Sequence, residues 1–226
     1  MSKKVILFLV EGGTDITSLE LALEKLFKNL NVILYITKGD LTSNKDIKPM
    51  NIKSKLGEKI KEALDRKKLQ SKDIIKVIHI MDTDGTYINE KAIFYKDVES
   101  FFYSEDGIYY KDTEAVKKRN EKKRENLAVL IKLSKVLRNV PYSMYYLSSN
   151  LEHLFHGVLN CTKQEKEDLA DKLEEDLYDS PEKLVEILEE FKIDGSYIET
   201  WDYLKEGNNS MERCSNLHLI FKEDLK

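Results

Sequence analysis

Carboxylates follow two of the most apolar segments of this sequence, at the points where those segments end. Glu11 follows the apolar run Val5–Val10, and Asp82 and Asp84 follow the β-branched run Ile74–Met81. Short runs of this kind are typical of strands buried on both faces of a parallel sheet. The carboxyl ends of such strands meet at one edge, about 4.8 Å apart. We therefore expect the three carboxylates to share one or two divalent ions, Mg²⁺ or Mn²⁺ rather than Zn²⁺.

Each acid also has a purely structural interpretation. Glu11 could cap the helix turn that follows it, and Asp82 and Asp84 could be ordinary turn residues before Gly85. Asp15 falls in the first turn of the next helix, where an acid is either a cap or a ligand. Dismissing the site requires the structural interpretation to hold at both strand ends at once.

The other apolar patterns predict the elements that position these acids. Further strands are expected at Asn31–Thr37, Ile108–Tyr110 and Tyr142–Leu147. Helical spacing predicts helices at Ile16–Leu26, at Ile52–Leu69, from Asp112 or Thr113 through Leu137, and at Leu151–Leu159. From Thr162 onward the pattern is helical throughout, with a clear helix start at Ser180-Pro181.

This order of elements predicts an α/β fold with a mainly parallel four-stranded sheet flanked by helices. We place the α/β domain at residues 1–160, with a loop-rich insertion at about 87–112. Residues 161–226 would form a helical C-terminal extension.

The composition fits a soluble, globular protein of the cytoplasm. The net charge of −4 argues mildly against a protein that simply coats nucleic acid, but bound metal ions would reverse the charge of an acidic site. No apolar run reaches the roughly 20 residues that a membrane helix needs, and the N-terminal run is too short for a signal peptide. Cys161 and Cys214 lie far apart, so we expect free thiols in a reducing compartment.

The turn Glu11-Gly-Gly-Thr-Asp15 after the first strand, together with Asp82-x-Asp84 after the third, resembles the TOPRIM domain over roughly residues 3–158. That domain is shared by topoisomerases, primases and the OLD-like and RloB-like nucleases. The second acid, four residues after the glutamate, is similar to the nuclease branch. Ser149-Asn150-Leu151-Glu152 is similar to an RloB-like motif, but it lacks the proline and phenylalanine of that pattern.

The resemblance implies a division of roles among these residues. Glu11, Asp82 and Asp84 would be the core metal ligands, and Asp15 and Glu152 would complete a second metal position. Asn150 could instead cap a helix that has Glu152 in its first turn. A basic residue would neutralise the transition-state phosphate. Lys205 and Arg213 are our candidates, because the tail that holds them is rich in polar residues.

Several other features have two interpretations. The run Lys117–Arg124 holds six basic residues in eight, which indicates either a solvated helix face or a phosphate-contacting surface. Asp40 is interpreted as a turn former and Trp201 as an anchor of the helical tail. His153, His156 and Cys161 are one ligand short of a zinc site. The tyrosines are interpreted as packing residues rather than base-stacking ones: Tyr109, Tyr110, Tyr142, Tyr145 and Tyr146.

The function expected from the resemblance is a Mg²⁺-dependent nuclease acting on DNA or RNA, with tRNA among the candidate substrates. No GxxxxGK[ST] motif occurs in these residues, which suggests independent action or a separate ATPase partner, as in phage defence. Two alternatives remain open. One is a primase-like nucleotidyl transferase that uses the same acids, and the other is a non-catalytic module that binds a partner ATPase.

Overall fold

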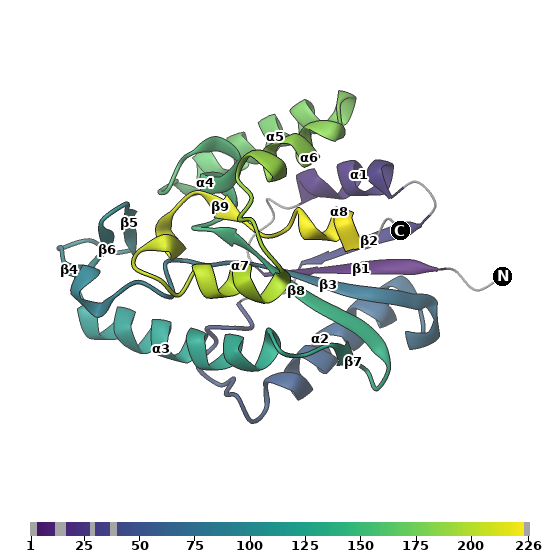
Figure 1. Cartoon of the computed structure of the whole chain (residues 1–226), viewed down its shortest axis with the longest axis horizontal. Coiled ribbons are helices and arrows are strands. Elements are labelled where there is room, and N and C mark those ends of the chain that lie inside the picture. Colours follow the sequence, from purple (N-terminus) through teal and green to yellow (C-terminus); the bar gives the residue numbers. More distant parts are fainter. Residues whose placement is uncertain (1–3, 12–16, 28–29, 37–39, 224–226) are drawn as a thin grey trace. The chain divides into compact units, whose positions relative to one another are not determined.

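The structure is a computed structural model that describes residues 4–11, 17–27, 30–36 and 40–223 (Figure 1). The strands are β1 (Val5–Val10), β2 (Asn31–Ile36), β3 (Ile74–Asp82), β4 (Ile93–Tyr95), β5 (Phe102–Ser104), β6 (Gly107–Tyr110), β7 (Lys135–Val136), β8 (Val140–Ser148) and β9 (Cys214–Ser215). The α-helices are α1 (Thr17–Leu26), α2 (Ile52–Lys67), α3 (Thr113–Leu130), α4 (Leu151–His156), α5 (Lys163–Asp179), α6 (Glu182–Glu190), α7 (Tyr197–Tyr203) and α8 (Leu219–Glu223). Short 3-10 helices are η2 (Ser71–Asp73), η3 (Glu90–Ala92) and η4 (Asn209–Met211).

The main sheet has the strand order β2-β1-β3-β8-β7, and β9 pairs with β8. β1 pairs in parallel with both β2 and β3, so that Val10 lies opposite Ile36 on one side and Ile80 on the other. β7 and β9 are antiparallel to β8. The predicted α/β fold with a mostly parallel sheet is therefore confirmed, and the four predicted strands are β1, β2, β3 and β8. The prediction missed β7 and β9, which make the sheet six-stranded.

The chain folds into two compact units, each made of three segments. Unit 1 comprises residues 1–81, 125–145 and 170–184, and unit 2 comprises residues 82–124, 146–169 and 185–226. The boundary that the sequence predicts at residue 160 falls inside the second segment of unit 2.

In unit 1 the periodicity read from the sequence corresponds to burial. Every side chain of β1 is buried, as expected for a central strand of a sheet that is covered on both faces. Helix α2 buries the apolar stripe that its 3.6-residue period predicted. The stripe consists of Ile52, Leu56, Ile60, Ala63 and Leu64.

In unit 2 the predicted loop-rich insertion is a small sheet with the order β4-β6-β5. β4 and β6 are parallel, and β5 and β6 are antiparallel. Ile108 of β6 is fully buried in a cluster with Ile93, Val116 and Met211. The sequence revealed only β6, because strands of three residues are too short to show an alternating pattern.

The long helix predicted to reach Leu137 ends at Leu130. The chain instead forms a hairpin in which Val136 of β7 pairs with Val140 of β8. Leu137 and Arg138 in this turn have positive φ angles of 45° and 76°, which non-glycine residues rarely adopt. Strand pairing thus overrides the helical spacing of the leucines, at a turn that no glycine marks.

The C-terminal region is helical as predicted, apart from the short strand β9. Trp201 of α7 is fully buried, and its ring lies edge-on against Tyr146 of β8 with centroids 5.0 Å apart. This contact confirms the prediction that Trp201 anchors the helical tail. Tyr142, Tyr145 and Tyr146 are buried, as expected for packing residues.

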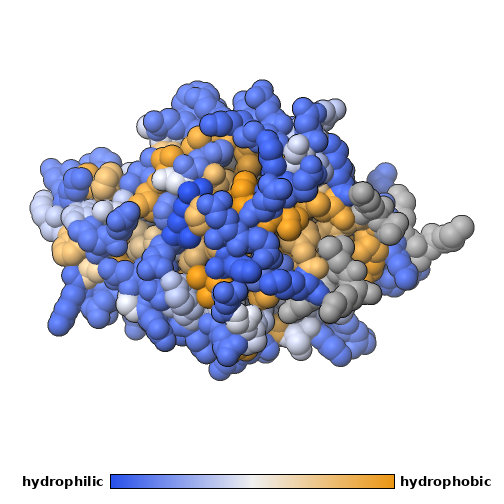
Figure 2. Space-filling view, turned by 45° about the horizontal axis from the view of Figure 1, so that its top comes forward, coloured by the Kyte–Doolittle hydropathy of each residue, from blue (hydrophilic) through white to orange (hydrophobic). Residues whose placement is uncertain are grey.

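Hydrophilic side chains cover most of the face that Figure 2 presents. Within the described ranges, no helix is both long and apolar enough to cross a membrane.

Candidate active site

The turn after β3 brings two of the predicted ligands together. Asp82 is the last residue of β3, and its neighbour Thr83 donates its backbone N–H to Leu147 of β8 at 3.0 Å. The N–H of Asp84 bonds to the carbonyl of Ser149 at 2.8 Å. Asp84 adopts the left-handed conformation, with φ of 49°, before Gly85. The turn is therefore fixed to the end of β8, and an Asp at this φ is one of the few non-glycine choices.

Helix α3 holds this turn through basic side chains that point inward. Lys123 Nζ donates to the carbonyl of Asp82 at 2.8 Å and to Oδ2 of Asp84 at 2.6 Å. Arg119 donates to the carbonyl of Asp84 at 2.8 Å, and Arg124 donates to that of Thr86 at 2.9 Å. These three residues, half of the six basic residues in Lys117–Arg124, bind the backbone of the acidic turn. They therefore form neither a solvated face nor a phosphate-contacting surface.

Glu152 lies in the first turn of α4, and Asn150 caps that helix as anticipated. The Asn150 side chain accepts the backbone N–H of His153 at 2.8 Å. Glu152 is only 2% exposed, and its Oε1 lies 2.7 Å from Nζ of Lys166 on α5. A buried carboxylate without a partner is costly, and the contact with Lys166 offsets part of that cost.

One cavity of about 370 Å³ joins these groups. Asp82, Asp84 and Lys166 contribute its polar part, and Phe101 and Phe102 contribute an aromatic wall. The remaining lining residues are Ser100, Tyr103, Asn150, Leu159, Asn160 and Cys161. The cavity thus offers acids, a cation and aromatic rings to a single ligand.

The aromatic wall is held in place by polar contacts. Asn160 accepts the N–H of Tyr103 at 2.8 Å and donates to its carbonyl at 2.7 Å. Arg119 donates to the Tyr103 hydroxyl at 2.9 Å and lies 4.5 Å from the ring centre of Phe101. Arg119 therefore contacts both the acidic turn and the aromatic wall.

The pKa of Asp82, which lines this cavity, is strongly shifted. Burial raises the pKa of Asp82 well above its usual range, and the negative charges of Asp84 and Glu152 add to this effect. Lys123 and Lys166 oppose it. Oδ1 of Asp82 is buried and has no hydrogen-bond partner among the described residues. An oxygen in this state is suited to accept a cation.

Glu11 belongs to unit 1 and is held there by two neighbours. Its Oε1 lies 2.8 Å from Nε2 of His79, and its Oε2 accepts bonds from the N–H and hydroxyl of Thr42 at 3.2 and 2.9 Å. The other ring nitrogen of His79, Nδ1, lies 2.7 Å from the hydroxyl of Tyr142. Burial lowers the pKa of His79 to about 3, against a smaller upward effect of Asp40. A neutral His79 whose Nδ1 accepts a hydrogen bond from the Tyr142 hydroxyl fits this contact.

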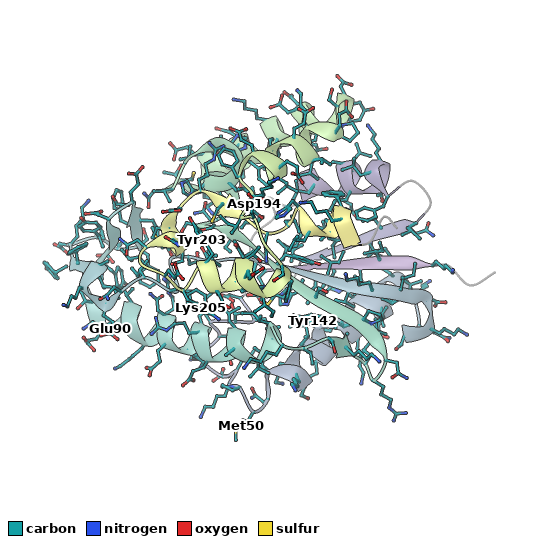
Figure 3. All side chains as sticks on the ribbon, viewed as in Figure 1. Met50, Glu90, Tyr142, Asp194, Tyr203 and Lys205 are labelled. Carbon is teal, nitrogen blue, oxygen red and sulfur yellow. The ribbon has the colours of Figure 1, made fainter. Side chains whose placement is uncertain are left out.

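The other predicted site residues lie elsewhere. Asp15 lies outside the described residues. Lys205, just after α7, forms an exposed ion pair with Asp202 at 2.6 Å (Figure 3). Arg213 donates Nε to the carbonyl of Leu154 at 2.9 Å and stacks on Phe191. Neither basic residue lines the cavity of Asp82 and Asp84. Asp40 is a turn former as predicted, since its Oδ1 accepts the N–H groups of Thr42 and Ser43.

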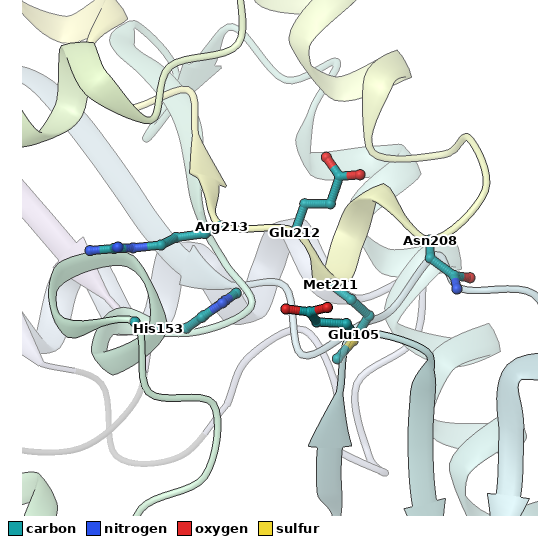
Figure 4. A pocket seen from close by; sticks show the side chains of 7 residues that line it. Glu105, His153, Asn208, Met211, Glu212 and Arg213 are labelled. Carbon is teal, nitrogen blue, oxygen red and sulfur yellow. The ribbon is translucent and has the colours of Figure 1, made fainter.

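Arg213 instead lines a second cavity, of about 470 Å³ (Figure 4). His153 and Glu105 extend toward each other in this cavity, and Nδ1 of His153 accepts the N–H of Ser149 at 3.0 Å. Burial lowers the pKa of His153, and Arg213 adds to this effect. The residue is therefore neutral at physiological pH, with its Nδ1 already used as an acceptor.

The donor set of the first cavity suits a hard cation. Mg²⁺ usually binds proteins through one or two carboxylates and keeps several waters or substrate phosphate oxygens as further ligands. Asp82, with its buried unpartnered Oδ1, and the neighbouring Asp84 meet that requirement. Across the described part of the chain, no group of three or more His, Cys, Asp or Glu side chains is arranged to hold a metal.

Sequence reasoning missed the cations of this site. Lys123 was recognised only as one member of a basic run, and Lys166 was not singled out. The signal for Lys123 was available, since Arg119 and Lys123 are four residues apart and so share one face of α3. The contact between Lys166 and Glu152 depends on how α5 packs, and no local pattern indicates it.

We find no family model that matches this chain, and no match among curated proteins or solved structures.

Proposed function

We propose that this protein is a metal-dependent phosphodiesterase that cleaves nucleic acid, with Asp82 and Asp84 as ligands of Mg²⁺ or Mn²⁺. The observation that carries the proposal is the cavity where both aspartates meet Lys166, with the buried Glu152 behind it. An acid whose pKa is raised by burial and by neighbouring carboxylates, beside a cation in a small cavity, is typical of catalytic sites.

The residues of the cavity have separate roles in this proposal. A bound ion would activate water and polarise the phosphate. Asp82 and Asp84 would hold the ion, and Lys123 would keep the Asp84 carboxylate and the turn in position. Lys166 would supply positive charge to the phosphate, the role that the sequence assigned to Lys205 or Arg213.

The aromatic wall favours a nucleic acid over a small phosphate ester. Phe102 lies beside the acids and is 38% exposed. Lys96 lies 4.0 Å from its ring centre, so a positive charge accompanies the ring. A base could stack on Phe102 while its phosphate reaches the aspartates, since every base has a π-face.

Cleavage assays with metal variation test this function. Labelled tRNA, single-stranded DNA and duplex DNA are incubated with Mg²⁺, Mn²⁺ or EDTA. We expect cleavage of at least one substrate, abolished by EDTA and reduced about 10²-fold or more by Asp84→Asn, because an electrostatic contact to the reacting group is worth that much. The matched control is Asp97→Asn, an exposed acid of the same unit, which should cleave like the wild type.

The same assay separates the alternatives. Primer extension from added nucleotides would indicate the nucleotidyl transferase. Metal binding without turnover on any substrate would indicate a non-catalytic module and would contradict the proposal. The Glu11 and Asp15 ligand roles, the ATPase partner, phage defence and the TOPRIM assignment depend on the resemblance and stay predictions.

A further inference from the structure

Two lysines of the chain itself pair with acids at the cavity, and one of them, Lys166, lines it. Of the three carboxylates, Asp84 lies 2.6 Å from the ammonium of Lys123, and Glu152 lies 2.7 Å from that of Lys166. Only Asp82 keeps a buried oxygen without a hydrogen-bond partner among the described residues. The positive charge is therefore distributed unevenly, with one lysine at each of two acids.

The two lysines differ in their access to a ligand. The side chain of Lys123 is 2% exposed, and its ammonium also binds the carbonyl of Asp82. Lys123 is therefore a positioning residue of the turn. The side chain of Lys166 is 40% exposed and lines the cavity together with Asp82 and Asp84. Its ammonium can contact a bound phosphate without leaving Glu152, because an ammonium has three donors.

Glu152 is one of the two acids, with Asp15, that the family resemblance assigns to a second metal position. In the structure, that carboxylate holds an ammonium at 2.7 Å instead, and it is almost fully buried. A second divalent ion would have to displace Lys166 or lie against another positive charge. Two-metal sites place their ions about 3.5–4 Å apart, one on each side of the phosphate. An ammonium that borders the same cavity as Asp82 and Asp84 can supply the second of those charges.

We infer that this is a one-ion site, in which Lys166, held by Glu152, takes the place of a second metal ion. The inference rests on the proposed phosphodiesterase function. Water forms the new P–O bond and loses a proton to solvent, and the ester P–O bond breaks. The leaving oxygen, stabilised by Lys166, accepts a proton from solvent. Lys166 is thus a catalytic residue that stabilises the leaving oxygen by its positive charge and does not transfer a proton.

Counting bound Mn²⁺ ions tests the inference without substrate. Titration of the metal-stripped protein, followed by the electron paramagnetic resonance of free Mn²⁺, should give one ion per wild-type chain. Lys166→Met keeps the side-chain stem and frees Glu152, so it should bind two ions. The double variant Lys166→Met/Glu152→Gln should return to one. Lys163→Met, on the same helix with its side chain 93% exposed, should match the wild type.

Two ions in the wild type, or one ion in both the wild type and Lys166→Met, would overturn the inference. If Lys166→Met does not fold, as judged by circular dichroism, Lys166→Gln replaces it in the same count. Because the count needs no turnover, failure of the proposed nuclease activity would not be confused with failure of the one-ion site.

Where cleavage is observed, its metal dependence gives a second readout. At limiting Mn²⁺, Lys166→Met should cleave about 10²-fold more slowly, as expected for loss of a transition-state contact. Excess Mn²⁺ should restore part of this rate as the second position fills, and Lys166→Arg should retain more activity than Lys166→Met. A loss of cleavage rate in Lys166→Met that excess Mn²⁺ does not reduce would contradict the inference that Lys166 takes the place of a second ion.

Discussion

At the scale of single residues, the two acids that line the cavity and the nearby Glu152 differ in their electrostatic surroundings. Asp84 and Glu152 each have a lysine partner, whereas burial and the two neighbouring carboxylates raise the pKa of Asp82. Relative to the unfolded chain, the folded protein therefore disfavours the charged form of Asp82 when no metal is bound. A buried acid with a raised pKa lowers the stability of the folded protein, a cost typical of residues that serve ligand binding.

This state of Asp82 predicts a stabilising substitution. An acid whose pKa is raised by folding costs no stability below its unfolded pKa of about 3.9, and it costs progressively more as pH rises toward its folded pKa. We expect Asp82→Asn to stabilise the EDTA-treated protein at pH 7 by more than about 1 kcal/mol, since one pKa unit corresponds to about 1.4 kcal/mol.

Urea unfolding between pH 3 and pH 8 measures this effect. The gain should shrink toward zero near pH 3, where Asp82 is protonated in both the folded and unfolded states. Asp97→Asn, at an exposed site, should show no such pH dependence. Asp82→Asn that is equally or less stable than the wild type at pH 7 would show that the carboxylate is charged and well solvated.

At the scale of elements, prediction from the sequence succeeded where periodicity and burial agree. The runs that became β1, β3 and α2 are long enough to show their period, and their cores formed as expected. Prediction failed where tertiary pairing selects the structure. β4, β5, β7 and β9, which the prediction missed, have two or three residues each, too few for any pattern.

The residues of the candidate site also differ in how far the sequence could predict them. Asp82 and Asp84 were predictable because they end a strongly β-branched run. The environment of Glu152 was not, because Lys166 reaches it from another helix. The roles of Lys205 and Arg213 were inferred from local composition, which carries no information about whether a side chain faces the acids.

The small sheet carries a prediction of its own, for Phe102. If a base stacks on this ring, Phe102→Ala should weaken binding of a single-stranded oligonucleotide about tenfold, since stacking is worth about 1–3 kcal/mol per base. Fluorescence anisotropy in Ca²⁺, which suppresses cleavage in many Mg²⁺ enzymes, measures this affinity.

Tyr95→Ala is the matched control, because Tyr95 is an aromatic residue of the same small sheet that is 71% exposed and does not line the cavity. Equal losses in Phe102→Ala and Tyr95→Ala would assign binding to the surface of the sheet in general. Unchanged affinity in both variants would show that the small sheet is not part of the binding site.

At the scale of the whole molecule, the chain passes between its two units after residues 81, 124, 145, 169 and 184. Both units are therefore discontinuous in sequence. The predicted division at residue 160 would remove strand β9, Lys166 and Trp201 from unit 2. Trp201 alone is a large, fully buried side chain whose loss from a core typically costs about 3–5 kcal/mol.

We therefore expect a fragment of residues 1–160 to lack a cooperative fold, whereas the full chain should unfold cooperatively. Near-ultraviolet circular dichroism and thermal unfolding measure both properties. A fragment 1–160 with a sharp transition and native-like aromatic signals would support the sequence-based boundary instead.

Arg119 gives the cavity a fixed width. Its guanidinium donates to the backbone of Asp84 on one side and to the hydroxyl of Tyr103 on the other. One planar guanidinium thus connects the acidic turn to the ring of Tyr103. If the proposed nucleic-acid function holds, Arg119 would influence which base fits between the acids and the rings without touching the base.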